Sequence, residues 1–399
     1  MKKHKLLFIS EDITLSQVVR LVELAKSVSG IYEIHFASSH AYPFVFNDCE
    51  FTHWKLTCIT SDYMQKKLDK GAPIYSETIL LGYVEQELHL YDQIKPDLII
   101  SDFRWSVSIS APYAKISYAI IINSYWNLNK LDFRLPIPNH PISSVFGHTT
   151  SQFFFQYAVP LFFYLYALPV NRLRKKFNLP KIGTLQDVLT KADFTLYPDT
   201  PLLSPLNVLG PKEIFLGPVV WSPDLNFDFT WKKDIDHLPL VYYTPGSSGN
   251  KKLNHIILER LAKMPVRVLF SSAGDDTIQY GSNIIAAPLI PGNKACKNAS
   301  LVICNGGSST AYQSLYEGTP VLGIPSNLDQ QISAKIIQRT GAGLLLNNES
   351  VSRRNFTCVV SNIIGDNQFK TNAQRIQDEF REYDYKAIFP RWLKNHLRL

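Results

Sequence analysis

The chain has 399 residues, a hydrophobic fraction of 45% and a formal net charge of +7 at pH 7. This length exceeds that of one ordinary domain and predicts two globular domains of roughly 200 residues each. The positive charge is mild and is not gathered into one basic tract, which argues against nucleic acid as a partner. It is compatible with an anionic nucleotide ligand, although solubility alone accounts for it more simply.

Cysteine usage and the amino-terminal residues indicate a reducing compartment. The starting segment MKKHKLLFISED has a basic beginning, but its apolar run LLFI is too short for a signal peptide. The cysteines are odd in number, widely spaced and without a CxxC pair, which argues against a disulfide framework and against a zinc site: Cys49, Cys58, Cys296, Cys304 and Cys358. We expect a cytoplasmic protein.

Short apolar strands alternate with helical patterns over the first half of the chain. KLLFISED (5–12) has the pattern of a buried strand, and apolar residues recur at helical spacing over 15–28, before Gly30. Further strands are predicted at 32–38, 96–103 and 118–124. Strands that are apolar on both faces and alternate with helices predict an α/β domain with a doubly wound parallel sheet.

An aromatic-rich segment, SQFFFQYAVPLFFYLYALPVNRLRKK (151–176), follows. Gln156 and Pro160 interrupt its apolar run, and aromatic residues outnumber aliphatic ones, so a buried or cleft-lining pair of helices is favoured over a transmembrane helix. A third alternative is a weak contact with a membrane surface, because aromatic residues followed by Arg172, Arg174, Lys175 and Lys176 suit the headgroup boundary.

Residues 215–239 break the alternation. This segment is rich in proline, aspartate and aromatic residues and is predicted to be an interdomain linker. A second alternation of strands and helices begins at LVYYTPGSSGN (240–250) and continues through 266–274 and 343–348. Two Rossmann-like halves in tandem are therefore expected.

The most informative segment is CNGGSSTAYQSLYEGTPVLGIPSNLDQQ (304–331). LVIC (301–304) predicts a buried strand, 305–309 a tight loop and 310–316 a helix. Gly306 and Gly307 allow close approach of the backbone to an anion, and the first N–H groups of the helix, with Ser308, Ser309 and Thr310, suit a diphosphate. After the next strand, Asp329 and Gln330 have side chains that can bond several sugar hydroxyls. The plain alternative is an ordinary strand, turn and helix, with Asp329 capping the helix that begins near Gln331.

The segment as a whole resembles the donor-binding signature of the family 1 glycosyltransferases, of the GT-B superfamily. This superfamily includes UDP-glucuronosyl- and UDP-glucosyltransferases and the macrolide, glycopeptide and sterol glycosyltransferases. The residues in register with the signature are Gly306, Gly307, Thr310, Gly318, Pro320, Asp329 and Gln330. The resemblance is strong over roughly 240–345 and diffuse before it.

This resemblance implies the GT-B fold, in which two Rossmann-like domains face a cleft and a C-terminal helix crosses back onto the N-domain. On this basis the N-terminal, acceptor-binding domain comprises residues 1–214 and the linker residues 215–239. The C-terminal domain, which binds the nucleotide sugar, comprises residues 240–375, and the crossover helix residues 376–399.

Further donor contacts are implied by the resemblance. Ser247 lies where the family places a Gly-Ser turn against the donor phosphates, although a plain surface turn also explains it. Gln313 stands where plant members carry a ribose-binding glutamate, and LIPG (289–292) lies where the nucleobase loop is expected. Asn305 replaces the usual histidine of the phosphate loop; its amide can donate to a phosphate but cannot carry positive charge.

The catalytic base departs from the usual family pattern. Many members carry a histidine after the first strand, whereas the corresponding tract here, SEDITLSQ (10–17), has none. Asp12 aligns with the aspartate of glycopeptide and sterol enzymes as a direct base, and Asp102 with the family's orienting aspartate. The alternative is that Asp12 or Thr14 only caps the first helix.

The sequence thus predicts an inverting hexosyltransferase that moves a hexose from a UDP- or TDP-sugar to a hydroxyl of an apolar small-molecule or lipid-like acceptor. We expect no cofactor and no metal, because the Asp-x-Asp tract at 234–236 lies in the predicted linker. Loss of the histidine leaves open a catalytically impaired protein that binds nucleotide sugar. An NAD-dependent oxidoreductase is disfavoured, since the tract after the first strand lacks GxGxxG. A hydrophobic acceptor is favoured by the aromatic residues Tyr125, Trp126, Phe133, Phe146, Phe153, Phe154 and Phe155.

Overall fold

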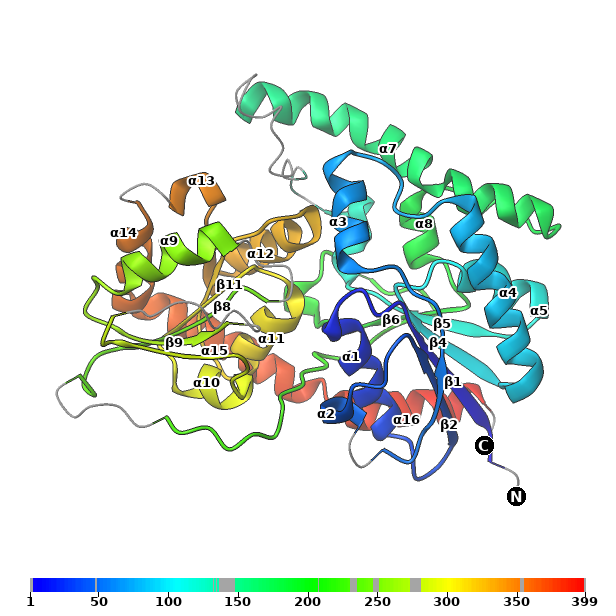
Figure 1. Cartoon of the computed structure of the whole chain (residues 1–399), viewed down its shortest axis with the longest axis horizontal. Helices are drawn as coiled ribbons and strands as arrows, with labels where there is room; N and C mark the ends of the chain where they lie inside the picture. The colour runs from blue at the N-terminus through cyan, green and yellow to red at the C-terminus, as the bar shows by residue number, and fades with distance from the viewer. Residues whose placement is uncertain are drawn as a thin grey trace. The chain divides into compact units, whose positions relative to one another are not determined.

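The computed structural model describes the chain except for residues 1–2, 47–48, 132, 134, 136–147, 207, 230–234, 247–250, 273–280, 352–354 and 398–399. The chain forms two compact units. The first comprises Met1–Arg134, Gly147–Val219 and Tyr383–Leu399, and the second Leu135–Phe146 and Val220–Glu382. Each unit is built on one parallel sheet with helices around it (Figure 1). The two Rossmann-like halves predicted from the sequence are confirmed.

The first sheet has seven strands in the order β3-β2-β1-β4-β5-β6-β7. Five of the six residues of β1 (Lys5–Ser10) are buried, because helices cover both faces of the sheet. The chain order reverses between β1 and β4, so these neighbours define the switch point of the sheet. The other strands are β2 (Glu33–Ser38), β3 (Thr52–Lys55), β4 (Leu98–Asp102), β5 (Tyr118–Ile121), β6 (Phe194–Tyr197) and β7 (Glu213–Phe215).

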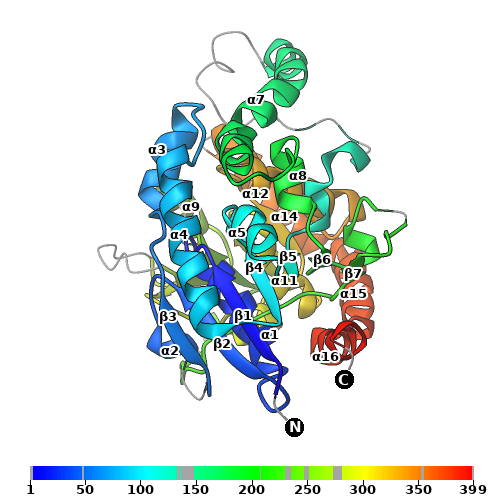
Figure 2. The same ribbon diagram turned by 90° about the vertical axis from the view of Figure 1, so that its right-hand side faces the viewer.

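Alternate residues of β1 pack against different helices. Leu7 and Ile9 belong to a core with Leu90 of α4 and Val107 of α5, and these two helices lie in front of the sheet in Figure 2. Phe8 stacks on Phe36 of β2, as the period of a strand requires. The helices of the first unit are α1 (Leu15–Lys26), α2 (Pro43–Phe46), α3 (Ser61–Asp69), α4 (Glu77–Ile94), α5 (Val107–Ala114), α7 (His148–Lys176), α8 (Leu185–Thr190) and α16 (Tyr385–His396).

The predicted first helix is confirmed as α1. Thr14 is its N-cap, and the side chain of Gln17 accepts hydrogen bonds from the backbone N–H groups of Ile13 and Thr14. The buried face consists of the apolar residues that recur at helical spacing: Val18, Val19, Leu21, Val22, Leu24 and Ala25. Because Thr14 caps the helix, capping does not explain Asp12.

The aromatic-rich segment corrects an expectation. Instead of a helix pair, it forms the single helix α7 of 29 residues, which continues through Pro160 and Pro169. Each proline removes one backbone hydrogen bond without ending the helix. Ala167, Val170 and Leu173 are buried, but one face is exposed rather than buried: Tyr157, Leu161, Phe162, Tyr164 and Leu165. In the part of the chain that the model describes, no helix is long and apolar enough to cross a membrane.

The C-terminal segment forms two helices rather than one. The first, α15 (Asn367–Glu382), belongs to the second unit, and α16 belongs to the first. Tyr385 of α16 donates a hydrogen bond to Glu23 of α1 at 2.9 Å, and Phe389 packs edge-on against Phe8. Figure 1 shows α16 beside α1. The predicted return of a C-terminal helix to the N-domain is confirmed.

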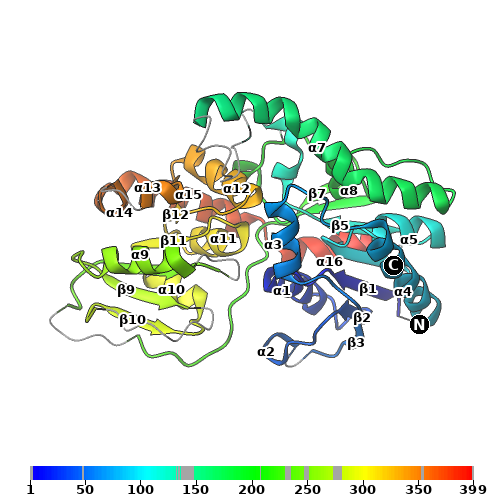
Figure 3. The ribbon, with the colours of Figure 1, turned by 45° about the horizontal axis from the view of Figure 1, so that its top comes forward.

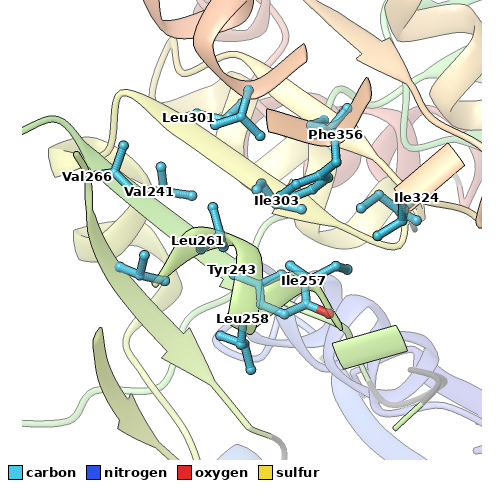
Figure 4. Packing of buried hydrophobic residues seen from close by; sticks show 14 of the residues in the cluster. Val241, Tyr243, Ile257, Leu258, Leu261, Val266, Leu301, Ile303, Ile324 and Phe356 are labelled. Atoms are coloured by element: carbon cyan, nitrogen blue, oxygen red, sulfur yellow. The ribbon is translucent and has the colours of Figure 1, made fainter. Parts of the chain in front are cut away.

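The second sheet has six strands in the order β10-β9-β8-β11-β12-β13, with its switch point between β8 and β11. Its core joins Tyr243 of β8, Leu258 of α9 and Phe356 of α14 (Figure 4), and Figure 3 shows α9 lying across β9. The strands are β8 (Leu240–Thr244), β9 (Arg267–Ser271), β10 (Ile284–Ala287), β11 (Leu301–Cys304), β12 (Val321–Gly323) and β13 (Gly343–Leu345). The remaining helices are α9 (Lys251–Leu261), α10 (Gly292–Asn298), α11 (Ser308–Tyr316), α12 (Leu328–Thr340), α13 (Asn348–Val351) and α14 (Asn355–Gly365).

Candidate functional site

The glycine-containing loop follows β11, at the switch point of the second sheet. Helix α11 begins at Ser308, two residues before the predicted start at Thr310, with Gly307 as its N-cap. The turn is completed early because Gly306 adopts a left-handed φ of +78°. The carboxyl end of β11 and the start of α11 are therefore joined by only three residues, as in other anion-binding loops.

Gly306 and Gly307 have different structural roles. An added Cβ at Gly306 would lie 2.9 Å from the Cβ of Ala334, in addition to the strain of its φ angle. Gly307 has an ordinary extended backbone, with φ of −65° and ψ of 145°, and an added Cβ there would approach only side-chain atoms, at 3.2 and 3.8 Å. Gly306 is thus needed to build the loop, whereas Gly307 is the glycine at the helix entrance.

Asn305 joins two loops at the switch point. Its Oδ1 accepts a hydrogen bond from the backbone N–H of Gly307 at 3.0 Å. Its Nδ2 lies 2.8 Å from the position that a Cβ of residue 246 would occupy, so the loop after β8 approaches it closely. Ser247, predicted on that same loop, lies outside the described residues.

Ser308, Ser309 and Thr310 form the first turn of α11. N–H groups in the first turn of a helix lack a carbonyl partner within the helix, and the helix dipole adds partial positive charge. Ser309 is exposed, and Ser308 and Thr310 are half-buried. All three residues are accessible at the end of the helix that could receive an anion.

Asp329 and Gln330 lie in the first turn of α12, which begins at Leu328. The helix starts earlier than predicted because Asn327 is the N-cap and accepts from the N–H of Gln330 at 3.0 Å. Asp329 is therefore not the cap. Gln330 is buried, and its Oε1 accepts from the N–H of Ser326 at 2.8 Å, so this side chain also closes the loop after β12.

Gln313 lies against the predicted nucleobase loop. Its Nε2 donates to the backbone carbonyl of Trp221 at 2.8 Å, and its side chain fills the space beside Gly292 that a Cβ would occupy. Gly292 begins α10, directly after Leu289, Ile290 and Pro291. Gln313 and the 289–292 loop, which the resemblance implies as ribose and nucleobase contacts, thus lie side by side.

Asp12 lies two residues beyond β1, in the first unit, with a left-handed φ of +54° that turns its side chain out of line with the strand. The side chain is 0% exposed. Its Oδ1 accepts from the hydroxyl of Tyr42 at 2.9 Å, and its Oδ2 accepts from the hydroxyl of Ser39. Nδ1 of His40 lies 3.4 Å from the same Oδ2.

Asp102, the last residue of β4, is also buried but has another partner. Arg20 of α1 donates to both of its oxygens, at 2.7 and 3.0 Å, and contacts Asn123 at 3.4 Å. Burial raises the pKa of Asp102, and the charge of Arg20 opposes this shift. The hydrogen bonds described for the Asp102 carboxylate all come from Arg20, and none joins it to Asp12.

Comparison with known proteins decides the family. The chain is 34% identical over its whole length to a PGL/p-HBAD biosynthesis glycosyltransferase of Mycobacterium tuberculosis, covering 93% of that protein. The chain belongs to the GT-B glycosyltransferases. A PGL/p-HBAD biosynthesis rhamnosyltransferase of Mycobacterium bovis is also 34% identical over 100% of this chain, which covers 88% of that protein.

A model of the C-terminal domain of erythromycin biosynthesis protein CIII-like proteins matches residues 256–383 of this glycosyltransferase. The solved structure of the spinosyn rhamnosyltransferase SpnG, complexed with thymidine diphosphate, has the same fold. It aligns with a TM-score of 0.72 at 15% identity and covers 98% of this chain and 100% of its own. The recognition and the fold class predicted from the sequence are confirmed.

Three neighbours of Asp12 in this glycosyltransferase were missed by the sequence analysis: Ser39, His40 and Tyr42. They follow β2, which pairs in parallel with β1, so the two loops emerge at the same edge of the sheet. The signal available was polar residues directly after a buried strand, SSHAY (38–42). The sequence pattern alone did not connect these residues to Asp12. The parallel pairing of β2 with β1 does, because it brings the two loops together.

A buried ion cluster lies directly behind Asp12. Arg104 contacts Glu11 at 3.1 Å and Glu87 at 2.8 Å, and Tyr83 donates to Glu11 at 3.0 Å. Burial raises the pKa of Glu11 to about 7, and the charge of Arg104 opposes this shift. Two carboxylates therefore share one guanidinium, and the cluster anchors the loop that begins at Glu11. Among the described residues, no group of histidine, cysteine and acidic side chains is arranged to hold a metal ion.

Proposed function

We propose that this glycosyltransferase moves a hexose or deoxyhexose from a TDP- or UDP-sugar to a hydroxyl of an apolar small-molecule or lipid-like acceptor, with inversion at the anomeric carbon. The observation that supports the donor side is the close approach of the loops after β8 and β11, where Asn305 accepts a hydrogen bond from Gly307 and lies beside Gly246. Deoxyhexose is included because a relative over the whole chain is a rhamnosyltransferase. A thymidine diphosphate is bound in the solved relative SpnG.

We assign the donor to the second unit. The diphosphate binds at the start of α11, where N–H groups and the helix dipole favour an anion, with Asn305, Gly306, Gly307, Ser308, Ser309 and Thr310. Gln313 and the 289–292 loop hold the nucleoside, and Asp329 and Gln330 orient the sugar. Ser247 adds a phosphate contact from the loop after β8.

We assign acceptor activation to the first unit. Asp12 and Asp102 flank its switch point, the edge at which open α/β sheets bind ligands. Asp12 supplies the negative charge that removal of the acceptor proton requires, and Asp102 supports the local geometry through Arg20. We keep the domain boundaries predicted from the sequence for these two roles. The acceptor-binding domain ends at residue 214, the linker at residue 239 and the nucleotide-sugar-binding domain at residue 375.

An apolar acceptor accords with the exposed face of α7. Tyr157, Leu161, Tyr164 and Leu165 recur at helical spacing and are between 38% and 73% exposed. Arg172 and Lys175, farther along, are also exposed. We propose that this face makes weak contact with the surface of a membrane that supplies a lipid-like acceptor. Sedimentation with anionic vesicles tests this proposal, since Leu161→Ser should reduce the bound fraction.

The alternative is a protein that binds nucleotide sugar and transfers nothing. It is favoured by one observation, that the carboxylate aligned with the catalytic base is 0% exposed. A hydroxyl of an acceptor reaches such a carboxylate only after Ser39, His40 or Tyr42 moves aside.

The test is a thermal-shift comparison of TDP and UDP, followed by mass detection of transfer from TDP-rhamnose and UDP-glucose to a panel of phenols and alkyl rhamnosides. A rise in Tm with a nucleotide and a glycoside product support the transferase. Binding without product from any acceptor, or donor hydrolysis as the only reaction, supports the alternative. No rise with either nucleotide contradicts both.

A further inference from the structure

The imidazole of His40 combines an exposed ring with a buried carboxylate behind it. Its side chain is 72% exposed, whereas that of Asp12 is 0% exposed. One edge of the ring therefore faces outward, and the Nδ1 edge faces inward to Asp12. A group that takes a proton from a bound acceptor needs this arrangement, because it must touch the acceptor and be stabilised when charged.

The position of His40 is that of a ligand-binding group. His40 follows β2 and Asp12 follows β1, and these strands pair in parallel with Ile9 opposite Ala37. Both residues therefore lie at the carboxyl edge of the sheet, beside the switch point between β1 and β4. This is the edge to which the proposed function assigns acceptor activation.

The hydrogen bonds fix the tautomer of the ring. A carboxylate only accepts, and the single hydroxyl proton of Ser39 is donated to Asp12. Nδ1 of His40 lies 2.6 Å from the Ser39 oxygen and 3.4 Å from Oδ2 of Asp12, so Nδ1 carries the proton and donates to these oxygens. The lone pair is then on Nε2, which has no hydrogen-bond partner among the described residues.

Asp12 itself is poorly placed to touch an acceptor. Its two oxygens accept hydrogen bonds from Tyr42 and Ser39, and the side chain has no exposed surface. It is well placed, however, to hold a ring and to stabilise an imidazolium. Asp12 is thus suited to position a base rather than to be one.

We propose that His40 is the general base of the transfer reaction and that Asp12 is its positioning carboxylate. This inference rests on the proposed function and deepens it. It moves the base from the loop after β1 to the loop after β2 and explains how the chain can lack a histidine in the tract 10–17.

The step balances without a further reactant. Nε2 of His40 takes the hydroxyl proton of the acceptor while the acceptor oxygen forms a bond to the anomeric carbon of the donor sugar. The bond from that carbon to the β-phosphate oxygen breaks, and its electron pair leaves with the nucleoside diphosphate. The imidazolium, stabilised by Asp12, then returns its proton to solvent or to the departing diphosphate.

Other titratable groups face this pair and bear on its pH dependence. The ring of Tyr42 lies tilted beside the imidazole, with centroids 5.9 Å apart, and burial raises its pKa to about 12, so it stays neutral. Burial lowers the pKa of His53, which bonds Ser38. Burial raises the pKa of Cys58 to about 12. Glu11, with its pKa raised to about 7, faces inward to Arg104 rather than to the ring.

The test compares two histidines that each face a carboxylate on the same sheet. His40→Asn keeps an amide that can donate to Ser39 and Asp12 but has no atom at the place of Nε2. His4 lies 3.3 Å from Asp97, ahead of β1 and at the opposite edge, so His4→Asn is the matched control. We expect His40→Asn to lower kcat about 10²–10⁴-fold with little change in donor KM, and His4→Asn to retain full activity.

The dependence of kcat/KM on pH is a second measurement. It distinguishes a catalytic His40 from one that only supports the structure. In the wild type, kcat/KM should fall on the acid side as a histidine becomes protonated. Asp12→Asn should lower kcat about 100-fold, and His40→Asn should lose the acid limb, because asparagine does not titrate. The double variant should lose little more than His40→Asn, since the two residues act as a unit.

Failure of this inference is distinct from failure of the proposed function. Full activity in His40→Asn, with large loss in Asp12→Asn, would make Asp12 the direct base and overturn the inference. An acid limb that persists unchanged in His40→Asn also overturns it. A wild type that transfers no sugar instead rejects the transferase itself, and the nucleotide thermal shift then shows whether a binder remains.

Discussion

Arg20 holds Asp102 by two hydrogen bonds, from Nε to Oδ2 at 2.7 Å and from Nη2 to Oδ1 at 3.0 Å. The pair joins the middle of α1 to the carboxyl end of β4, directly beside the switch point of the first sheet. The Asp102 side chain is 1% exposed and that of Arg20 17% exposed. Bidentate geometry and burial make this pair a support of the loops at this edge of the first sheet rather than a surface contact.

Asp102→Asn should therefore act mainly on stability. Loss of one charge from a buried pair typically costs about 3–5 kcal/mol, because the other charge stays buried without compensation. We expect a loss near the lower end of that range, since asparagine can still accept from Arg20. Urea unfolding measures it, and Asp97→Asn, at an exposed contact with His4, is the control. Activity per folded molecule should fall less than in His40→Asn; an equal fall would make Asp102 part of the catalytic apparatus.

Gly307→Val should abolish nucleotide binding while the protein stays folded. The backbone of Gly307 suits any residue, and its added Cβ would meet no backbone atom within 4 Å, but a branched side chain there blocks approach of a diphosphate. At a nucleotide concentration of 100 Kd, the wild type gains about 2.7 kcal/mol, and the variant should gain none. Differential scanning fluorimetry with TDP and UDP measures this.

Gly365→Val provides the control for Gly307→Val, since nothing lies within 4 Å of an added Cβ at Gly365. Its nucleotide-induced shift should match that of the wild type. A persistent shift in Gly307→Val would place the nucleotide away from the start of α11. Gly306 is unsuitable for this test, because its φ of +78° makes any substitution a folding defect.

Asp329→Ala should reduce turnover with a nucleotide sugar and leave TDP or UDP binding nearly intact. The residue is half-buried in the first turn of α12 and is not the cap of that helix, so its removal leaves the helix start in place. Steady-state kinetics and calorimetric titration of the nucleotide give the two readings. Asn327→Ala is the contrast: it removes the cap and should cost about 1 kcal/mol of stability. Equal losses of turnover and nucleotide affinity in Asp329→Ala would mean that Asp329 shapes the loop.

Glu11 should make the first unit less stable as pH rises through the weakly acidic range. Its pKa is raised from 4.5 to about 7 in the folded protein, chiefly by burial. Below pH 4.5 the carboxyl is protonated in both states and the contribution is fully present. Between 4.5 and about 7 the folded state binds more protons than the unfolded state, so the free energy of unfolding falls as pH rises.

Glu11→Gln should flatten this part of the stability profile, because glutamine does not titrate and can still accept from Tyr83. Urea unfolding between pH 5 and pH 8 measures the slope, and the sign of the difference between the two proteins is the prediction. A wild-type profile that falls no more steeply than that of Glu11→Gln would show that the carboxyl is ionised throughout, as a partner of Arg104. Asp97→Asn, far from this cluster, should keep the wild-type slope.

The local structure of the candidate donor loops was predictable because their residues are close together in the sequence. Asn305 to Thr310 and Asp329 to Gln330 fall within two successive strand, turn and helix units, so the spacing alone places them after neighbouring strands. The errors there were local: α11 and α12 begin two or three residues earlier than expected, since Gly307 and Asn327 are the caps. Gln313 and Gly292 required the tertiary structure, which places one against the other.

The long helix α7 shows a second feature that the sequence did not predict correctly. Its composition suggested burial, and the prolines suggested a break, yet it is one helix with an exposed apolar face. Aromatic content does not specify which face of a helix meets the core when both faces are apolar. Only packing decides this, here through Ala167, Val170 and Leu173 against α4 and α5.

The sequence by itself determined the class of the protein: two parallel α/β units of a GT-B glycosyltransferase, a glycine-containing loop after a buried strand and no histidine in the tract after the first strand. Local patterns suffice for these, because apolar periodicity and turn residues act over a few positions. Only the tertiary structure decided which side chains surround Asp12. His40 lies 28 residues away along the chain, and the parallel register of β1 and β2 brings its ring to a carboxylate that the same packing buries.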